Sequence, residues 1–183
     1  MEVNMFDVNK FYDELAEKAN SQSFDENLDM ALSVCMIELC NYKDHCDANN
    51  TDAKKFEICF EAFTSVLFNR FDLDKIKCDE YIEKCNSLLE ELQEEEPELF
   101  DECVNITCEI MHTLAYISTR DNRNISAILK LLFESSEFYL QRNNVSENEE
   151  EYEEKIAEIG SQIKALNVSS LTRIHNVFGK SGK

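Results

Sequence analysis

The stretch CDEYIEKCNSLLEELQEEEP, residues 78–97, decides how this sequence folds. Its apolar residues recur three or four positions apart, which is the period of a helix with one buried face. The remaining positions are mostly acidic. Pro97 then marks the first turn of a new helix, because proline lacks an amide hydrogen that would be unpaired there anyway. The stretch therefore predicts a helical hairpin with an acidic outer surface.

The same helical period recurs along the rest of the chain. Only 3 of 183 residues are Gly and only 1 is Pro, and tight turns and bulges depend on those residues, so a sheet-rich fold is disfavoured. The 43% of hydrophobic residues suffices for one sizeable core. We expect an all-α, single-domain bundle of about seven helices. They are expected at about residues 7–19, 23–46, 51–68, 72–92, 97–118, 124–140 and 146–166.

Local signals refine this expectation. Ser23 with Glu26, and Ser146 with Glu149, have the spacing of capping boxes that begin helices. Asn124 is expected to cap the sixth helix, and Asp72 or Asp74 to begin the fourth. The fifth helix is apolar nearly all round and is expected at the centre of the bundle. The third helix carries additional apolar residues at Ile58 and Phe68. We therefore expect it to be buried on two sides.

The end of the chain differs in charge from the rest. No acid follows Glu158, whereas Lys164, Arg173, Lys180 and Lys183 do follow it. We expect residues 1–166 to form the helical bundle domain. Residues 167–183 would be a basic C-terminal tail that contains at most a short helix. The tail either folds back on the acidic body or frays.

The charge of the chain is its clearest functional signal. Lys and Arg number 18 against 38 Asp and Glu, a formal net charge of −20 at pH 7. Such a field repels nucleic acid and anionic membranes and attracts basic proteins at rates that depend on salt. We therefore expect a basic protein partner, and neither nucleic acid nor membrane.

Two acidic runs are candidate binding surfaces. Neighbouring carboxylates can engage Arg and Lys side chains of a partner, although a charge run can also be only a solvated surface. The first candidate surface consists of Glu90, Glu91, Glu94, Glu95, Glu98, Asp101 and Glu102. The second consists of Glu149, Glu150, Glu151, Glu153 and Glu154.

Eight cysteines raise the question of cellular compartment. The chain begins MEVNMFDVNKFYDEL, without the basic and apolar regions of a secretory signal, and it has no run of eighteen apolar residues. We therefore expect a cytoplasmic protein whose cysteines stay reduced and pack as small apolar residues.

Motifs for metals and catalysis are incomplete. Cys35, Cys40 and Cys46 lack the pair spacing of a structural zinc site. Glu109 and His112 form a Glu-x-x-His pair, as in di-iron helical bundles, but the second such pair is absent. The sequence has no GxSxG, glycine-rich phosphate loop or HExxH. We expect no metal, no cofactor, no catalytic residue and no enzymatic activity, with His112 hydrogen-bonded to its neighbours.

A family resemblance covers roughly residues 28–165. Cys35, Glu38 and Tyr42, followed by an aromatic-rich helix, an acidic helix and the segments 108–116 and 124–140, resemble the YjaG-like bacterial all-helical family of unknown function. That family's Cys-Glu-Arg-x-x-Pro-Asn-Tyr signature is kept here at those three residues. Leu39 replaces its Arg, and its Pro is missing.

The chain also resembles the small acidic helical immunity proteins of contact-dependent and other polymorphic toxin systems. The resemblance implies an immunity protein that binds a cognate toxin domain, often a basic nuclease, and occludes its active site. Two alternatives stay open. One is a helical regulatory interaction module, such as a Bcl-2-like protein, and the other is a metal-dependent helical-bundle enzyme.

Overall fold

The computed structural model describes residues 6–49, 56–95, 97–142 and 149–166, and all the regular structure within them is helical. The all-α bundle expected from the sequence is thereby confirmed, with seven α-helices and one 3-10 turn in the described residues. The helices are α1 (Val8–Ser21), α2 (Phe24–Asn49), α3 (Glu57–Asn69), η2 (Leu73–Lys75), α4 (Cys78–Glu95), α5 (Pro97–Thr119), α6 (Arg123–Arg142) and α7 (Glu149–Lys164).

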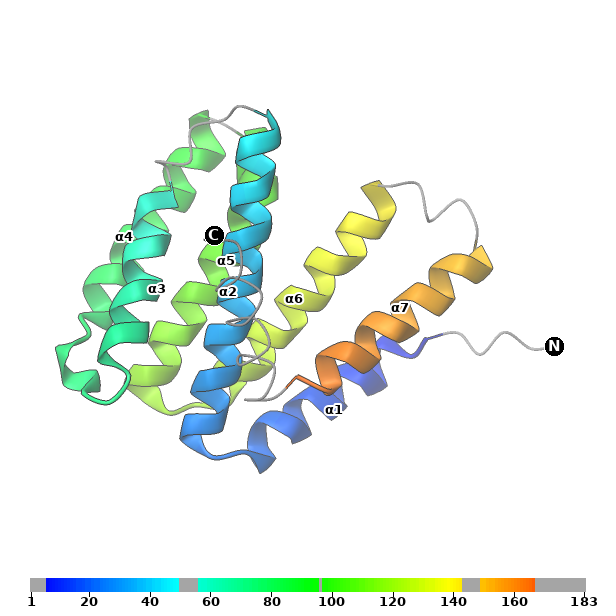
Figure 1. Cartoon of the computed structure of the whole chain (residues 1–183), viewed down its shortest axis with the longest axis horizontal. Helices are drawn as coiled ribbons and strands as arrows, with labels where there is room; N and C mark the ends of the chain where they lie inside the picture. Colours follow the sequence, from blue (N-terminus) through cyan, green and yellow to red (C-terminus); the bar gives the residue numbers. More distant parts are fainter. Residues whose placement is uncertain (1–5, 50–55, 96, 143–148, 167–183) are drawn as a thin grey trace, which may run out of the picture.

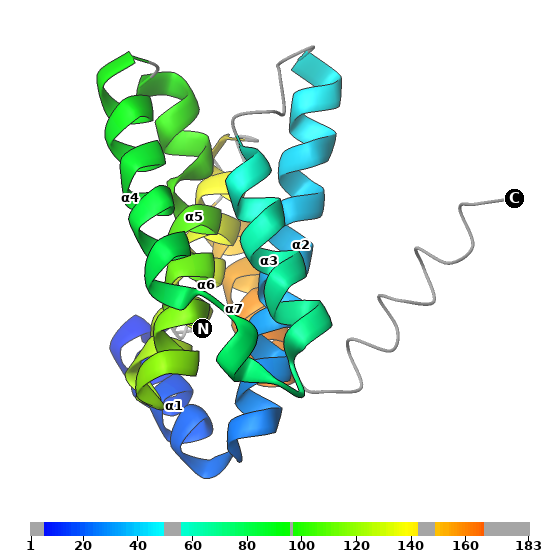
Figure 2. The ribbon, with the colours of Figure 1, turned by 90° about the vertical axis from the view of Figure 1, so that its left-hand side faces the viewer.

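The helices form two groups that share an interface. α2, α3, α4 and α5 pack together as one group, and α1 and α7 pack on α6 as the other (Figure 1). α6 joins the groups because it packs on both α2 and α5. α5 contacts α2, α3, α4 and α6, so the predicted central position of the fifth helix is confirmed. The view in Figure 2 shows α4 on the outside of the molecule, beside α5.

Several helix starts follow the predicted chemistry. The Ser23 hydroxyl accepts from the Glu26 amide at 3.3 Å, while Glu26 Oε2 accepts from the Ser23 amide at 2.9 Å, which confirms this capping box. Asp7 caps α1 by accepting from the Lys10 amide at 3.0 Å. Pro97 is the first residue of α5, as predicted. Ser146 lies outside the described residues.

Two predicted helix starts are wrong. α4 begins at Cys78 rather than at Asp72 or Asp74, because that segment instead forms the 3-10 turn η2, closed by the Ile76 amide on the Leu73 carbonyl. α6 begins at Arg123. Asn124 therefore lies inside the helix, where its amide group bonds backward to the preceding turn instead of capping.

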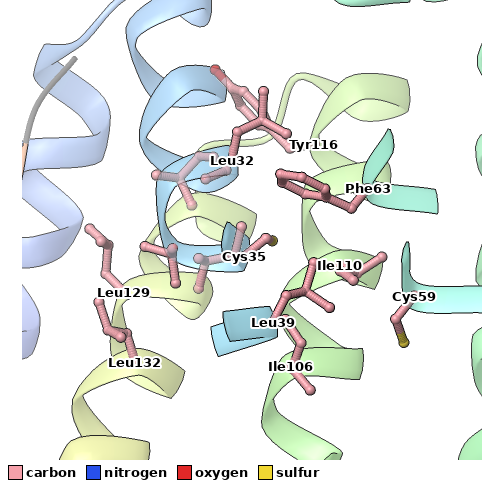
Figure 3. Packing of buried hydrophobic residues seen from close by; sticks show 14 of the residues in the cluster. Leu32, Cys35, Leu39, Cys59, Phe63, Ile106, Ile110, Tyr116, Leu129 and Leu132 are labelled. Atoms are coloured by element: carbon pink, nitrogen blue, oxygen red, sulfur yellow. The ribbon is translucent and has the colours of Figure 1, made fainter. Parts of the chain in front are cut away.

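The core lies between the two groups and inside the four-helix group. Figure 3 shows side chains of α2, α3 and α5 meeting there, among them Cys35, Cys59 and Ile110, all of which are buried. The third helix is not buried on two sides as expected. Phe68 is 82% exposed, whereas Ile58 is partly buried against the core.

Candidate functional site

The first predicted binding surface lies along α4. Cys85, Leu88 and Leu92 are buried against the bundle, and this fixes the opposite side of the helix toward solvent. Four predicted site residues, Glu90, Glu91, Glu94 and Glu95, are exposed there, and we call them the acidic α4 surface. The spacing of the apolar residues in the sequence therefore predicts the side of α4 on which these carboxylates lie.

The charge of the acidic α4 surface is largely uncompensated. The lysine just before α4, Lys77, and the one within it, Lys84, both pair with Glu80, at 3.0 and 2.9 Å. Within the described residues, no ion pair reaches Glu90, Glu94 or Glu95. These acids also lie in the last turns of α4, where the helix dipole disfavours negative charge. Their position thus does not serve the stability of the helix.

The remaining residues of the first predicted surface lie at the start of α5. Glu98, Asp101 and Glu102 belong to the first turns of that helix, which runs beside α4. Their side chains lie outside the described residues. The structure thus brings the two helices together as predicted.

The second predicted surface, at the start of α7, is partly used inside the protein. Glu153 accepts from the Phe6 amide at 2.9 Å, and Glu151 pairs with Lys155 at 2.8 Å. Glu154 is exposed, whereas the side chains of Glu149 and Glu150 lie outside the described residues. Acids at a helix N-terminus also stabilise the helix dipole. This run therefore has a structural explanation that the acidic α4 surface lacks.

Two aromatic side chains are exposed near the end of α3, Phe68 in its last turn and Phe71 just after it. Phe68 is 82% exposed and Phe71 92%, and the Arg70 guanidinium lies 5.1 Å from the centroid of the Phe71 ring. The start of α4 borders a hollow of about 520 Å³, with Asp79 and Glu80 among its lining residues. Two large apolar rings exposed this close together in the sequence are typical of a binding surface.

A buried carboxyl group lies at the centre of the bundle. Glu109 on α5 has none of its surface exposed, and among the described residues neither of its carboxyl oxygens has a hydrogen-bond partner. The hydroxyl groups nearby are engaged elsewhere, because Thr113 donates to the Glu109 carbonyl at 2.8 Å and Thr107 donates to the Cys103 carbonyl at 3.0 Å. Such a place disfavours an unpaired carboxylate and favours the protonated form of Glu109.

A second acid, Glu38 on α2, affects the pKa of Glu109. Burial raises the pKa of Glu38 to about 7, with a hydrogen bond to Asn41 opposing the shift. Burial raises the pKa of Glu109 well above its ordinary value, and the charge of Glu38 raises it further. Burial, the charge of Glu109 and other nearby acids also raise the pKa of the Cys35 thiol. The two acids thus lie close enough for the charge of Glu38 to affect the ionisation of Glu109.

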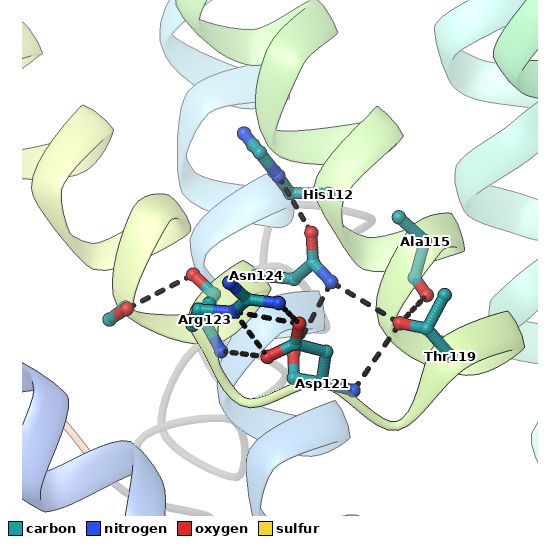
Figure 4. Close-up of polar contacts among 7 residues, drawn as sticks. His112, Ala115, Thr119, Asp121, Arg123 and Asn124 are labelled. Atoms are coloured by element: carbon teal, nitrogen blue, oxygen red, sulfur yellow. Dashed lines mark hydrogen bonds and ion pairs between the residues drawn. The ribbon is translucent and has the colours of Figure 1, made fainter.

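The Glu-x-x-His pair does not form a site. Glu109 lies in the core near α2, whereas His112 Nδ1 hydrogen-bonds Asn124 Oδ1 at 3.0 Å, at the start of α6 (Figure 4). Asn124 in turn donates to the Asp121 carbonyl at 3.2 Å. The described residues contain no group of three or more His, Cys, Asp or Glu side chains that could hold a metal ion. The arrangement explains His112 as a link between α5 and α6.

Comparison with protein-family models, curated proteins and solved structures found no match. The resemblance to YjaG-like and immunity proteins therefore stays a prediction. In the described part of the chain, no helix has both the length and the apolar character needed to cross a membrane.

Proposed function

We propose that this protein binds a basic protein partner through the acidic α4 surface and the adjoining start of α5, and that it acts by binding alone, without a catalytic step. In its most specific form, the proposal is a cytoplasmic immunity protein that occludes the active site of a nuclease-type bacterial toxin domain. A nuclease needs a cationic cleft for phosphate, and a row of carboxylates is complementary to such a cleft.

One observation carries the proposal. Glu90, Glu94 and Glu95 are exposed and form no ion pair with any residue that the structure describes, and they lie at the end of a helix where the dipole makes negative charge unfavourable. Like charges at this density also repel one another, so solubility alone is a poor explanation. A partner that supplies Arg and Lys relieves both costs on binding, and the same charges accelerate its approach.

Charge reversal at matched sites tests the surface. The partner is captured with the tagged wild-type protein, and its association and dissociation rates are then measured at two ionic strengths. Glu90→Lys with Glu94→Lys, one turn apart on α4, should lower the association rate about tenfold at low salt. Asp13→Lys with Glu17→Lys makes the same change in net charge on α1, in the other helix group, and should leave the rate nearly unchanged.

The outcomes separate binding from neutralisation. Equal effects of the two double variants would show that the partner senses only net charge, and would exclude the acidic α4 surface as its site. Neutralisation additionally requires that the captured partner lose its own activity at a one-to-one ratio. A partner that stays fully active in the complex would contradict the immunity function.

The exposed aromatics favour a second candidate, a helical regulatory interaction module that binds through Phe68 and Phe71. Exposed large apolar side chains are typical anchors of protein interfaces. Phe68→Ser with Phe71→Ser should then weaken partner binding mainly by faster dissociation, whereas the α4 charge reversals should act mainly on association.

A further inference from the structure

The two exposed phenylalanine rings adjoin a hollow in the protein surface. The hollow begins two residues after Phe71, has a volume of about 520 Å³ and is lined in part by Leu73, Asp74 and Asp79. Phe68 and Phe71 themselves are 82% and 92% exposed. We call the two rings and the hollow together the Phe71 surface. Large apolar rings next to a hollow are typical of a surface that another segment covers.

The hollow carries unbalanced negative charge. Its two basic lining residues are engaged, since Lys77 pairs with Glu80 at 3.0 Å and the Arg120 guanidinium lies over the ring of Phe24.

The two aspartates of the hollow, by contrast, are available to a partner. Asp74 and Asp79 are both exposed, and in the described part of the chain no ion pair reaches either of them. The Phe71 surface therefore fits a segment that offers both apolar and basic side chains.

The last residues of this chain have that composition. Residues 167–183 lie outside the part of the chain that the structure describes. Their sequence places apolar residues three or four positions apart at Leu171, Ile174 and Phe178, which is the spacing of one helix face. The charged residues of the segment are all basic: Arg173, Lys180 and Lys183. The segment thus matches the Phe71 surface in apolar character and in charge.

The described chain also ends where the segment can reach this surface. Leu166 is held beside α1, because its carbonyl accepts from the Lys18 ammonium group at 2.7 Å. α1 leads directly into α2, and the ion pair of Asp29 with Arg70 joins the start of α2 to the end of α3. Figures 1 and 2 show the end of α7 and the end of α3 in the same half of the molecule.

The length of the segment suffices for this path. Its seventeen residues span about 25 Å as a helix and about 55 Å when extended. The path from Leu166 to Phe71 crosses only the side-chain contacts of Lys18 and Arg70 and the first turns of α2.

We propose that residues 167–183 bind the Phe71 surface of the same chain and cover it. Leu171, Ile174 and Phe178 would pack on the two exposed rings, and a basic side chain of the segment would pair with the aspartates of the hollow. The contact is autoinhibitory, because a partner that binds through the same rings must first displace the segment. This inference concerns the isolated protein and does not rest on the acidic α4 surface.

Photo-cross-linking in the full chain tests the contact directly. Phe71 is replaced by p-benzoylphenylalanine, which keeps an aromatic ring at that position, and the purified protein is irradiated at low concentration. Mass spectrometry of the monomeric product should show position 71 joined mainly to residues 167–183. The same replacement at Phe138, which is 49% exposed on α6, is the control and should give no such link.

Native-state proteolysis measures the contact without a cross-linker. Trypsin cleaves after Arg173, and docking of the segment should slow this cleavage in the folded wild-type chain. Phe68→Ser with Phe71→Ser should raise the cleavage rate about tenfold, because the apolar contacts are lost. Phe138→Ser is the control and should leave the rate nearly unchanged. Thermal unfolding of each variant shows that the change does not come from loss of the fold.

Neutralisation of charge tests the hollow separately. Asp74→Asn with Asp79→Asn should raise the rate of cleavage after Arg173 severalfold at low salt and less at high salt. Glu90→Gln with Glu94→Gln makes the same change in net charge at the other end of α4, and should have little effect.

Several results would contradict the proposal. The proposal is wrong if position 71 forms no cross-link to residues 167–183, or if the links join two chains, which would identify a second copy as the occupant. Cleavage of the wild-type chain as fast as that of the double phenylalanine variant would show that the rings are uncovered. An equal or larger effect of Glu90→Gln with Glu94→Gln would assign the segment to the acidic α4 surface instead.

Discussion

Arg70, at the end of α3, forms an ion pair with Asp29 in the second turn of α2. The Asp29 side chain is only 9% exposed, and its burial raises its pKa even though Arg70 opposes the shift. The pair fixes the end of α3 against α2, next to the turn that carries Phe71.

Removal of Arg70 should therefore be costly. Arg70→Leu leaves a buried carboxylate without its counter-charge, and should lower the free energy of unfolding at pH 7 by about 3 kcal/mol. Asp29→Asn in the same chain should recover most of the loss, because no buried charge then remains. Urea denaturation of the single and double variants measures both effects. Additive losses would mean that the two residues act independently.

The buried carboxyl groups predict an unusual dependence of stability on pH. The pKa of Glu38 is raised to about 7, and burial also raises the pKa of Glu109 well above its ordinary value, so the folded protein keeps protons that the unfolded chain releases near pH 4.5. Their stabilising protonation is complete below about pH 4.5 and is lost as pH rises through 7. Each retained proton costs about 1.4 kcal/mol of stability per pH unit in that range.

A variant separates this effect from general charge repulsion. Glu109→Met should increase the free energy of unfolding at pH 8 and change it much less at pH 4.5, so the slope between the two becomes shallower. Glu83→Gln, at an exposed position of α4, is the control for loss of one charge. Urea denaturation across this range measures the slope. Parallel profiles for wild type and Glu109→Met would show that Glu109 is not protonated in the folded state.

A close contact between α7 and the segment before α1 predicts a coupling energy. A Cβ atom on Gly160 would lie 2.8 Å from Cζ of Phe6, whose ring stacks on Phe133 with centroids 5.5 Å apart. Replacing glycine by alanine in a helix usually raises the free energy of unfolding by about 1 kcal/mol. At position 160, however, the added methyl group displaces the Phe6 ring. Gly160→Ala should therefore bring no gain alone and about 1 kcal/mol in a Phe6→Ala background.

A double-mutant cycle by chemical denaturation measures this coupling. Ala157→Gly, at an exposed position of the same helix, provides the control and should combine additively with Phe6→Ala. A gain from Gly160→Ala in the wild-type background would show that Phe6 does not pack on Gly160.

Arg120 combines an unfavourable backbone with a favourable ring contact. Its φ is 59°, in the left-handed region, and its guanidinium carbon lies 3.4 Å from the centroid of the Phe24 ring. Arg120→Ala loses the contact and keeps the strained backbone, whereas Arg120→Gly loses the contact but relieves the strain. The glycine variant should be the more stable of the two by about 1 kcal/mol. Thermal unfolding compares them, and an equal or more stable alanine variant would contradict the assigned strain.

The sequence predicted the helices well because burial of one face requires a regular period. The predicted start of the fourth helix at Asp72 or Asp74 was wrong, because this short polar segment forms a 3-10 turn instead. The prediction from sequence also failed at Phe68, because composition does not reveal how many neighbours a helix has. Both errors depend on tertiary contacts, which local pattern does not encode.

The acids Glu38 and Glu109 show the same limit of prediction from sequence for the candidate site. Glu38 and Glu109 are two of 38 acids, and they are 71 positions apart in the sequence. A usable signal was nonetheless present for Glu109, because a central helix that is apolar nearly all round leaves an acid no face toward solvent. Identifying Glu38 as its neighbour required the packing of α2 on α5.

The packing of α1 has a consequence for biosynthesis. α1 packs mainly on α6 and α7, and the Lys18 ammonium group donates to the carbonyls of Lys164 and Leu166 at 2.8 and 2.7 Å. At a synthesis rate of roughly 5–20 residues per second, those partners leave the ribosome about 5–30 s after α1. Phe11 and Leu15 have no permanent cover during that time. During synthesis, the apolar face of α1 is therefore exposed and can be recognised by chaperones. The helices α2 to α5 can pack together during the same time.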